Sequence, residues 1–185
     1  MSFSLKNAFI TLLFLSFILV LFGCSSKNTP TSSNTSSNPS SDTVSKNCRI
    51  FYYNCDKDNY FYIDKTLEVT DNALLSALTT ALKSADSNKL MILNEDVYVK
   101  SGKLDQENNL ISVDLSPSYY NILRRVGSSS ESGMLHSMAY TYGYNYGVDK
   151  VIITVDGKPY NGSHILLEEG ESIPVITTDI QAFNN

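Results

Sequence analysis

Short segments rich in β-branched and aromatic residues alternate along the chain with stretches whose apolar residues recur at helical spacing. The first kind of segment predicts strands at 49–54, 60–63, 97–100, 110–115 and 150–155. Leucines at helical spacing predict a helix over 74–82, with Thr70 and Asp71 at its N-terminus as cap and first-turn charge. Asp156 and Gly157 predict a tight turn after the last of these strands.

Further signals complete the order of elements. Ser116 followed by Pro117 predicts a short helix. A capping box from Ser128 to Glu131 predicts that a longer helix begins near Ser129. Two short edge strands are predicted at 165–167 and 173–176. The order strand–strand–helix–strand–strand–helix–strand predicts an α+β fold, in which two main helices and the short extra helix pack on one face of a mixed β-sheet.

The segment 139–148, AYTYGYNYGV, fits two conformations. A tyrosine stands at every second position, as in a half-buried strand. A helix that continues from Ser130 instead explains the apolar residues upstream, because they share one stripe with two of the tyrosines: Met134, Leu135 and Met138. Gly147 then supplies the left-handed residue that ends the helix. The sequence therefore predicts a helix.

This helix divides the four tyrosines between two faces. At 100° per residue, Tyr142 and Tyr146 share the apolar stripe and are predicted to be core residues. Tyr140 and Tyr144 lie on the opposite side and are predicted to be exposed. Because exposed tyrosines often anchor interfaces, Tyr140 and Tyr144 are the candidate residues of a partner surface. The alternative is that they cover neighbouring loops.

The N-terminal residues 1–23 have the pattern of a lipoprotein signal peptide. Lys6 is the only charge before an apolar run at 8–22, which would span about 22 Å as a helix, less than the roughly 30 Å of a bilayer core. The run ends in Leu21-Phe22-Gly23-Cys24, which resembles the bacterial lipobox. That resemblance implies cleavage before Cys24, acylation of its sulfur and an extracytoplasmic chain anchored in the cell membrane. The alternatives are an ordinary signal peptide and an uncleaved anchor.

The composition changes after Cys24. Residues 25–47 contain nine Ser, four Thr, four Asn and two Pro, too little apolar surface to offset the entropy of ordering, so 24–47 is predicted to be a disordered linker. The remainder suits one domain at 48–170, followed by a C-terminal extension at 171–185. We expect the linker to hold this domain away from the membrane.

Charge and cysteine content narrow the function. The net charge is −5, and it is about −6 without the leader because Lys6 is lost. A nucleic-acid partner is not expected, since that function requires a basic surface. Cys48 and Cys55 flank a predicted strand that would separate their Cα atoms by about 20 Å, beyond the roughly 7 Å limit for a disulfide. We therefore expect both to be free thiols.

Residues typical of catalysis are few and scattered. His136 and His164 have no neighbours at metal-ligand spacing, and the sequence contains no nucleophile or metalloprotease motif. Asp114 and Asp156 each follow a strand valine, and we interpret them as strand-end and turn residues; an acid/base pair is the alternative. The sequence predicts no catalytic residue, no metal and no cofactor, hence a protein that is not an enzyme.

Several short motifs in the C-terminal half resemble one known family, the GerMN domain of sporulation and spore germination. They are Val113-Asp114-Leu115-Ser116 at a strand end, Glu131 at a helix start, Tyr140-Thr141 in that helix, and Val148, Val151 and Val155-Asp156-Gly157 around the following strand. The resemblance covers about 49–160. It implies a secreted or lipid-anchored, non-catalytic module of spore-forming or related Gram-positive bacteria, which acts through protein assembly at the cell envelope, and it carries over no catalytic residue.

Two classes of function therefore remain. The first is an envelope lipoprotein whose head binds envelope or sporulation proteins. The second is a receptor for a small ligand or a cell-wall glycan, or a weak hydrolase, that uses a tyrosine-lined groove.

Overall fold

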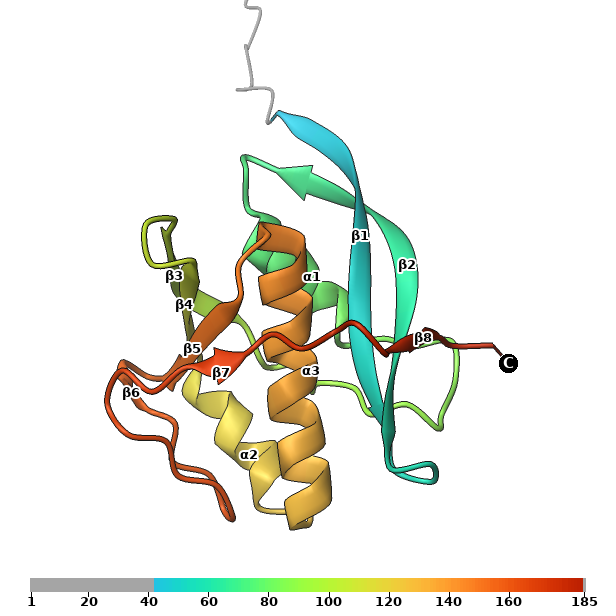
Figure 1. Ribbon diagram of the computed structural model, residues 1–185, viewed down its shortest axis with the longest axis vertical. Helices are drawn as coiled ribbons and strands as arrows, with labels where there is room; N and C mark the ends of the chain where they lie inside the picture. Colours follow the sequence, from blue (N-terminus) through green and yellow to red (C-terminus); the bar gives the residue numbers. More distant parts are fainter. Residues whose placement is uncertain (1–41, 185) are drawn as a thin grey trace, which may run out of the picture. The chain divides into compact units, whose positions relative to one another are not determined.

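The two main helices lie between two β-sheets (Figure 1). The computed structural model describes residues 42–184. The first sheet has the order β1-β2-β8, with β1 at Thr43–Asn54, β2 at Asn59–Thr70 and β8 at Gln181–Ala182. The second contains β3 (Val99–Asp105), β4 (Leu110–Leu115), β5 (Lys150–Val155), β6 (Lys158–Pro159) and β7 (Ile173–Pro174).

The predicted α+β class is confirmed, but the strands form two sheets rather than one. β1 and β2 are an antiparallel pair, and β2 also pairs with the parallel strand β8. In the second sheet β4 pairs with β3 antiparallel and with β5 in parallel, and both β6 and β7 add to β5. The alternation of side chains predicts strands but not their partners, so the division into two sheets could not be predicted locally.

The helices are α1 (Leu74–Ala81), the 3-10 turn η2 (Pro117–Tyr119), α2 (Tyr120–Leu123) and α3 (Ser128–Tyr146). The predicted cap of α1 is wrong, because α1 begins after Ala73 without a side-chain cap bond. Thr70 ends β2, and Asp71 and Asn72 have positive φ angles of 50° and 59°. These residues reverse the chain between strand and helix.

The tyrosine-rich segment is helical, as predicted. α3 continues to Tyr146, and Gly147 follows in the left-handed conformation, with φ 66° and ψ 39°. The predicted capping box is wrong, because the residue before the helix is Gly127 and no side chain caps it. Glu131 instead turns into the protein, as described below.

The fold begins earlier and ends later than predicted. β1 starts at Thr43, so residues 43–47 belong to a strand paired with 66–70 and not to a disordered linker. A polar segment can form a strand when a partner strand satisfies its backbone hydrogen bonds. At the other end, residues 173–174 and 181–182 are strands of the two sheets. Residues 165–167 form no strand; Leu166 makes one isolated bridge to Asn161. The signal peptide, Cys24 and linker residues 24–41 lie outside the described residues.

The core fills the space between the sheets and the helices. Its buried residues come from predicted helices and strands alike and include Leu74, Leu78, Leu82, Val113, Met138 and Val151. Tyr142 is fully buried, and its hydroxyl lies 2.9 Å from Thr79 Oγ1. Burial raises the pKa of Tyr142 above its ordinary value. Cys48 is buried and Cys55 exposed, and both are free thiols.

Candidate functional site

A second aromatic cluster lies on the face of β1 and β2 that points away from the core. Ile50 and Tyr52 belong to the main core, whereas Phe51 and Tyr53, which are also buried, point to the opposite face of β1. We call this cluster the outer aromatic face, and it consists of Phe51, Tyr53, Tyr60, Tyr62, His136, Tyr140 and Tyr144. Its ring centroids lie 5.2–6.2 Å apart, from the Tyr60–Tyr140 pair to the Tyr60–His136 pair, the spacing of aromatic contacts.

The two tyrosines predicted to be exposed differ in environment. Tyr144 is 45% exposed, as expected, but Tyr140 is only 8% exposed, so its predicted exposure is wrong. Tyr140 packs edge-on against Phe51 and Tyr60, at 6.1 Å and 5.2 Å between ring centroids. The angular position of a residue on a helix shows which side faces the main core, but it does not reveal a second cluster on the other side.

Arg49 sits between two tyrosines of this face. Its guanidinium carbon lies 3.6 Å from the ring centroid of Tyr62 and 5.1 Å from that of Tyr144. Arg49 also donates two hydrogen bonds to the Asp64 carboxylate, at 2.8 and 2.9 Å. These bonds hold the pKa of Asp64 below its ordinary value. An arginine fixed by a carboxylate between tyrosine rings keeps one orientation at the surface.

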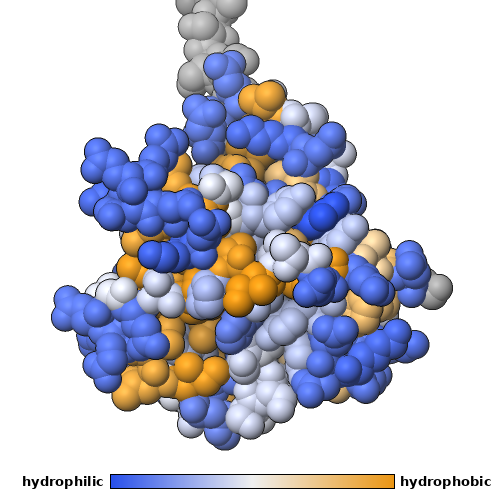
Figure 2. Space-filling view, viewed as in Figure 1, coloured by the Kyte–Doolittle hydropathy of each residue, from blue (hydrophilic) through white to orange (hydrophobic). Residues whose placement is uncertain are grey.

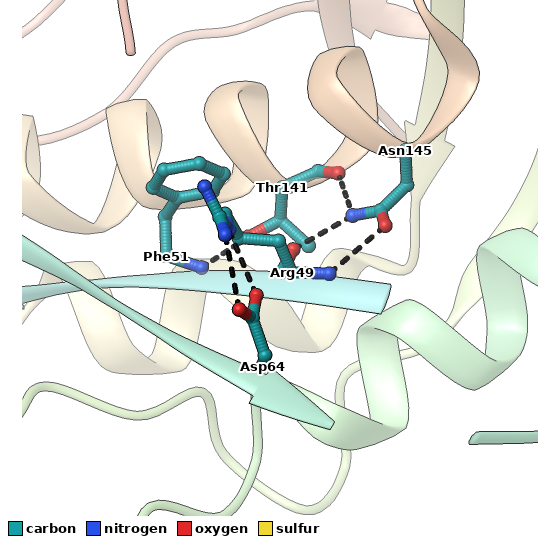
Figure 3. A network of polar contacts seen from close by, with 5 residues as sticks. All are labelled: Arg49, Phe51, Asp64, Thr141 and Asn145. Carbon is teal, nitrogen blue, oxygen red and sulfur yellow. Dashed lines mark hydrogen bonds and ion pairs between the residues drawn. The ribbon is translucent and has the colours of Figure 1, made fainter. Parts of the chain in front are cut away.

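Side chains of α3 take the place of a neighbouring strand along the outer edge of β1 (Figure 3). Asn145 accepts the Arg49 N–H at 3.0 Å and donates to the Arg49 carbonyl at 2.7 Å. One turn earlier, Thr141 Oγ1 accepts the N–H of Phe51 at 3.0 Å. The helix therefore closes this part of the sheet edge and holds Tyr140 and Tyr144 beside β1. The role of Asn145 could not be predicted from the sequence, because a polar residue between tyrosines carries no signal of a partner 96 residues away.

Glu131 is a fully buried carboxylate that holds the loop after β6. It accepts hydrogen bonds from the Tyr160 hydroxyl at 3.2 Å and from the backbone N–H groups of Ser163, His164 and Ile165 at 3.0–3.1 Å. The Glu131 carboxylate lies so close to the backbone at Gly162 that no side chain fits there, since a Cβ would lie 1.8 Å from Glu131 Oε1. Burial, with Tyr119 and Glu131 nearby, raises the pKa of Tyr160.

The loop held by Glu131 forms one wall of a hollow of about 750 Å³. The opposite wall comes from α2 and the residue after it, and the lining includes Tyr120, Leu123, Arg124, Lys158, Leu167 and Glu168. Arg124, Lys158 and Glu168 form no ion pair with other residues in the described part of the chain. The lining of the hollow therefore combines apolar side chains with unpaired charges of both signs.

The residues considered for catalysis have structural contacts. Asp114 Oδ1 accepts hydrogen bonds from Thr154 Oγ1 and the Gly157 N–H, both at 2.8 Å, so it holds the turn after β5. Lys100 Nζ lies 2.6 Å from Asp156 Oδ1. His136 Nδ1 is 2.9 Å from the Ser132 carbonyl of the preceding turn. Between residues 42 and 184 no group of three or more His, Cys, Asp or Glu side chains is arranged to hold a metal ion.

Together, the two sheets with α3 between them and the outer aromatic face define an α+β domain with a second aromatic cluster outside the main core, in which Tyr144 is the exposed ring. Residues 50–161 match the family model Germane, described as sporulation and spore germination. The chain therefore belongs to this family, and the family predicted from the sequence motifs is confirmed.

One solved structure supports the fold. The tandem GerMN domains of the sporulation protein GerM from Bacillus subtilis are similar, with a TM-score of 0.50 and 17% identity over 82% of this chain and 51% of that chain. The chain thus spans about half the length of that structure. The first GerMN domain of the same protein gives a TM-score of 0.46 at 16% identity, covering 65% of this chain and 93% of that one.

A candidate lipoprotein from Clostridium perfringens gives a TM-score of 0.43 at 17% identity, covering 72% of this chain and 87% of that one. No curated protein matches the chain in sequence. Among the helices within 42–184, none has both the length and the apolar composition needed to cross a membrane.

Proposed function

We propose that the head, from residue 42 onward, is a non-catalytic interaction module of the sporulation and germination family, and that a partner protein docks on the outer aromatic face. One observation carries this proposal. The face is a cluster of tyrosines around Arg49 that lies outside the main core. Tyrosine and arginine are the residues that most often supply binding energy at interfaces. An envelope or sporulation protein that presents apolar or aromatic side chains fits this surface.

The proposed interaction is tested by capture of envelope proteins on immobilised head. Tyr144→Ala and Arg49→Ala are each expected to reduce retention of the specific partner at least about tenfold, roughly 1.4 kcal/mol, because Tyr144 is the exposed ring of the face and the Arg49 guanidinium lies beside it. The matched control is Tyr98→Ala, since Tyr98 is 57% exposed but is not part of this face.

Equal losses in all three variants would contradict a role of the outer aromatic face. Retention of cell-wall glycan fragments, unaffected by Tyr144→Ala, would instead favour ligand binding in the hollow beside the loop that Glu131 holds. The apolar side chains and unpaired charges in the lining of this hollow are the features that support this second function.

We further propose that the head is held at the outer surface of the cell membrane by a lipid on Cys24. The support is the lipobox-like sequence that ends at Cys24 and the polar segment that follows it. Metabolic labelling with a palmitate analogue is expected to mark the wild-type chain and not Cys24→Ala. Cys55→Ala is the control, because Cys55 is an exposed thiol of the head and should leave labelling unchanged. Equal labelling of wild type and Cys24→Ala would contradict the anchor.

A further inference from the structure

The C-terminal segment joins the two sheets. We call residues 173–183 the strap. It begins as β7, where Ile173 and Pro174 pair with β5, and crosses α3 to β8, where Gln181 and Ala182 pair with β2 (Figure 1). Apolar residues are exposed near the middle of this view (Figure 2), where the strap crosses the helix, and Ile176 is 62% exposed. The strap lies after the residues that match the family, which end at 161.

The first part of the strap is well held. The Val175 N–H donates to the Asp149 carbonyl at 2.9 Å. The Val175 side chain packs against α3 at Gly143, where an added Cβ would lie only 2.2 Å from Val175 Cγ2. Because Gly143 has no side chain, the strap can pass close over the helix at this point.

The distal part has few contacts. β8 forms two ladder pairs with β2, Phe61 with Gln181 and Tyr62 with Ala182. The Phe183 N–H donates to the Tyr62 carbonyl at 2.9 Å, and the Phe183 ring packs edge-on against Phe61 at 5.6 Å. Within the described chain, residues 176–180 form one hydrogen bond, the internal one from Ile180 N–H to the Thr177 carbonyl. Residues 176–180 therefore connect the well-held part of the strap, where it crosses α3, to the short terminal strand β8.

β2 pairs with β1 along one of its edges. Its other edge, at Phe61 and Tyr62, is the one that accepts β8. When β8 leaves, the Phe61 ring loses its cover and the Tyr62 carbonyl loses its donor. Exposed backbone groups at a sheet edge pair readily with another strand. A second copy of this chain carries the same Gln181, Ala182 and Phe183, so its β8 satisfies the same contacts.

We propose that the β2 edge accepts the C-terminal strand of a second copy, so that two chains associate by exchanging their β8 strands. The link 176–180 can span up to about 17 Å when extended, enough to leave its own sheet for a neighbouring molecule. The β8 strand of the same chain competes for this edge at an effective concentration on the order of millimolar. Exchanged dimers therefore accumulate slowly in solution, and their fraction increases with protein concentration. This inference is independent of the partner proposed for the outer aromatic face.

Disulfide trapping tests the exchange, with heads that all carry Cys55→Ser. One variant carries Tyr62→Cys and the other Ala182→Cys, positions that face each other in the ladder. A disulfide between different chains forms efficiently only if β8 of one copy pairs with β2 of the other. After mixing at about 0.1 mM under mild oxidation, we expect the mixed dimer to form at least about fivefold faster than in the control, and faster still at higher concentration. In the control, Thr178→Cys of the link replaces Ala182→Cys.

A head that carries both Tyr62→Cys and Ala182→Cys serves as the reference for correct pairing, because its disulfide should close within one chain. Internal closure of this reference, with mixed dimers forming no faster than in the Thr178→Cys control, would overturn the exchange. Failure of the reference to close would also overturn it, since the proposal depends on the pairing of β2 with β8.

Discussion

Replacing Tyr142 with alanine is expected to destabilise the head by about 3–5 kcal/mol, a large part of the roughly 5–15 kcal/mol of a typical domain. The Tyr142 side chain is fully buried among core residues, and its hydroxyl is hydrogen-bonded to Thr79. The substitution leaves a cavity of aromatic size and removes the partner of a buried hydroxyl. Denaturant unfolding of the isolated head measures the loss.

The neighbouring tyrosines provide matched controls for Tyr142→Ala. Tyr144→Ala should change the free energy of unfolding by under about 1 kcal/mol, because that ring is 45% exposed. Tyr140→Ala should lie between the two, at about 2–3 kcal/mol, since its ring packs on Phe51 and Tyr60 outside the main core. Equal unfolding midpoints for Tyr142→Ala and Tyr144→Ala would contradict the assignment of the helix faces.

The second large effect is expected from Glu131→Gln, at about 2–4 kcal/mol of destabilisation. The carboxylate accepts hydrogen bonds from Tyr160 and from three backbone N–H groups at 163–165. The isosteric amide has one acceptor oxygen, and its NH₂ group would face donors, so buried N–H groups lose their partner. Denaturant unfolding measures the loss, and hydrogen exchange of the amides at 163–165 locates it.

Glu171→Gln is the control for this substitution. The Glu171 carboxylate also accepts a backbone N–H, that of Glu168 at 2.7 Å, but it does so at the exposed surface. Water can replace that acceptor, so the expected change is within about 0.5 kcal/mol. If Glu131→Gln and Glu171→Gln had the same unfolding midpoint, with unchanged amide protection at 163–165, Glu131 would not hold the loop.

Periodicity and turn chemistry in the sequence were sufficient to determine several features of this protein. The apolar stripe through Met134 and Met138 established that the tyrosine segment is a helix, and Gly147 marked its end. Of the two tyrosines predicted to be core residues, Tyr142 is fully buried and Tyr146 is half-buried against the core, and the strand at 150–155 lies where it was predicted. Short motifs around Glu131 and Asp156 were enough to predict the family. These features depend on residues close together in the chain, so they can be predicted from the local spacing of residue types.

Tertiary structure alone decided which neighbours these elements meet. Tyr140 is buried because Phe51 and Tyr60 stand on the outer face of β1 and β2, and Asn145 replaces a strand because Arg49 lies beside it. Glu131 matches a helix cap in sequence, yet it binds a loop about 30 residues further along.

The strap shows the same limit of local sequence. Its residues 181–182 form a strand only because β2, 120 residues earlier, presents a free edge. A residue's local spacing determines which side of an element it occupies. The contact it makes there depends on segments distant in the chain, whose approach is set by the packing of the whole domain.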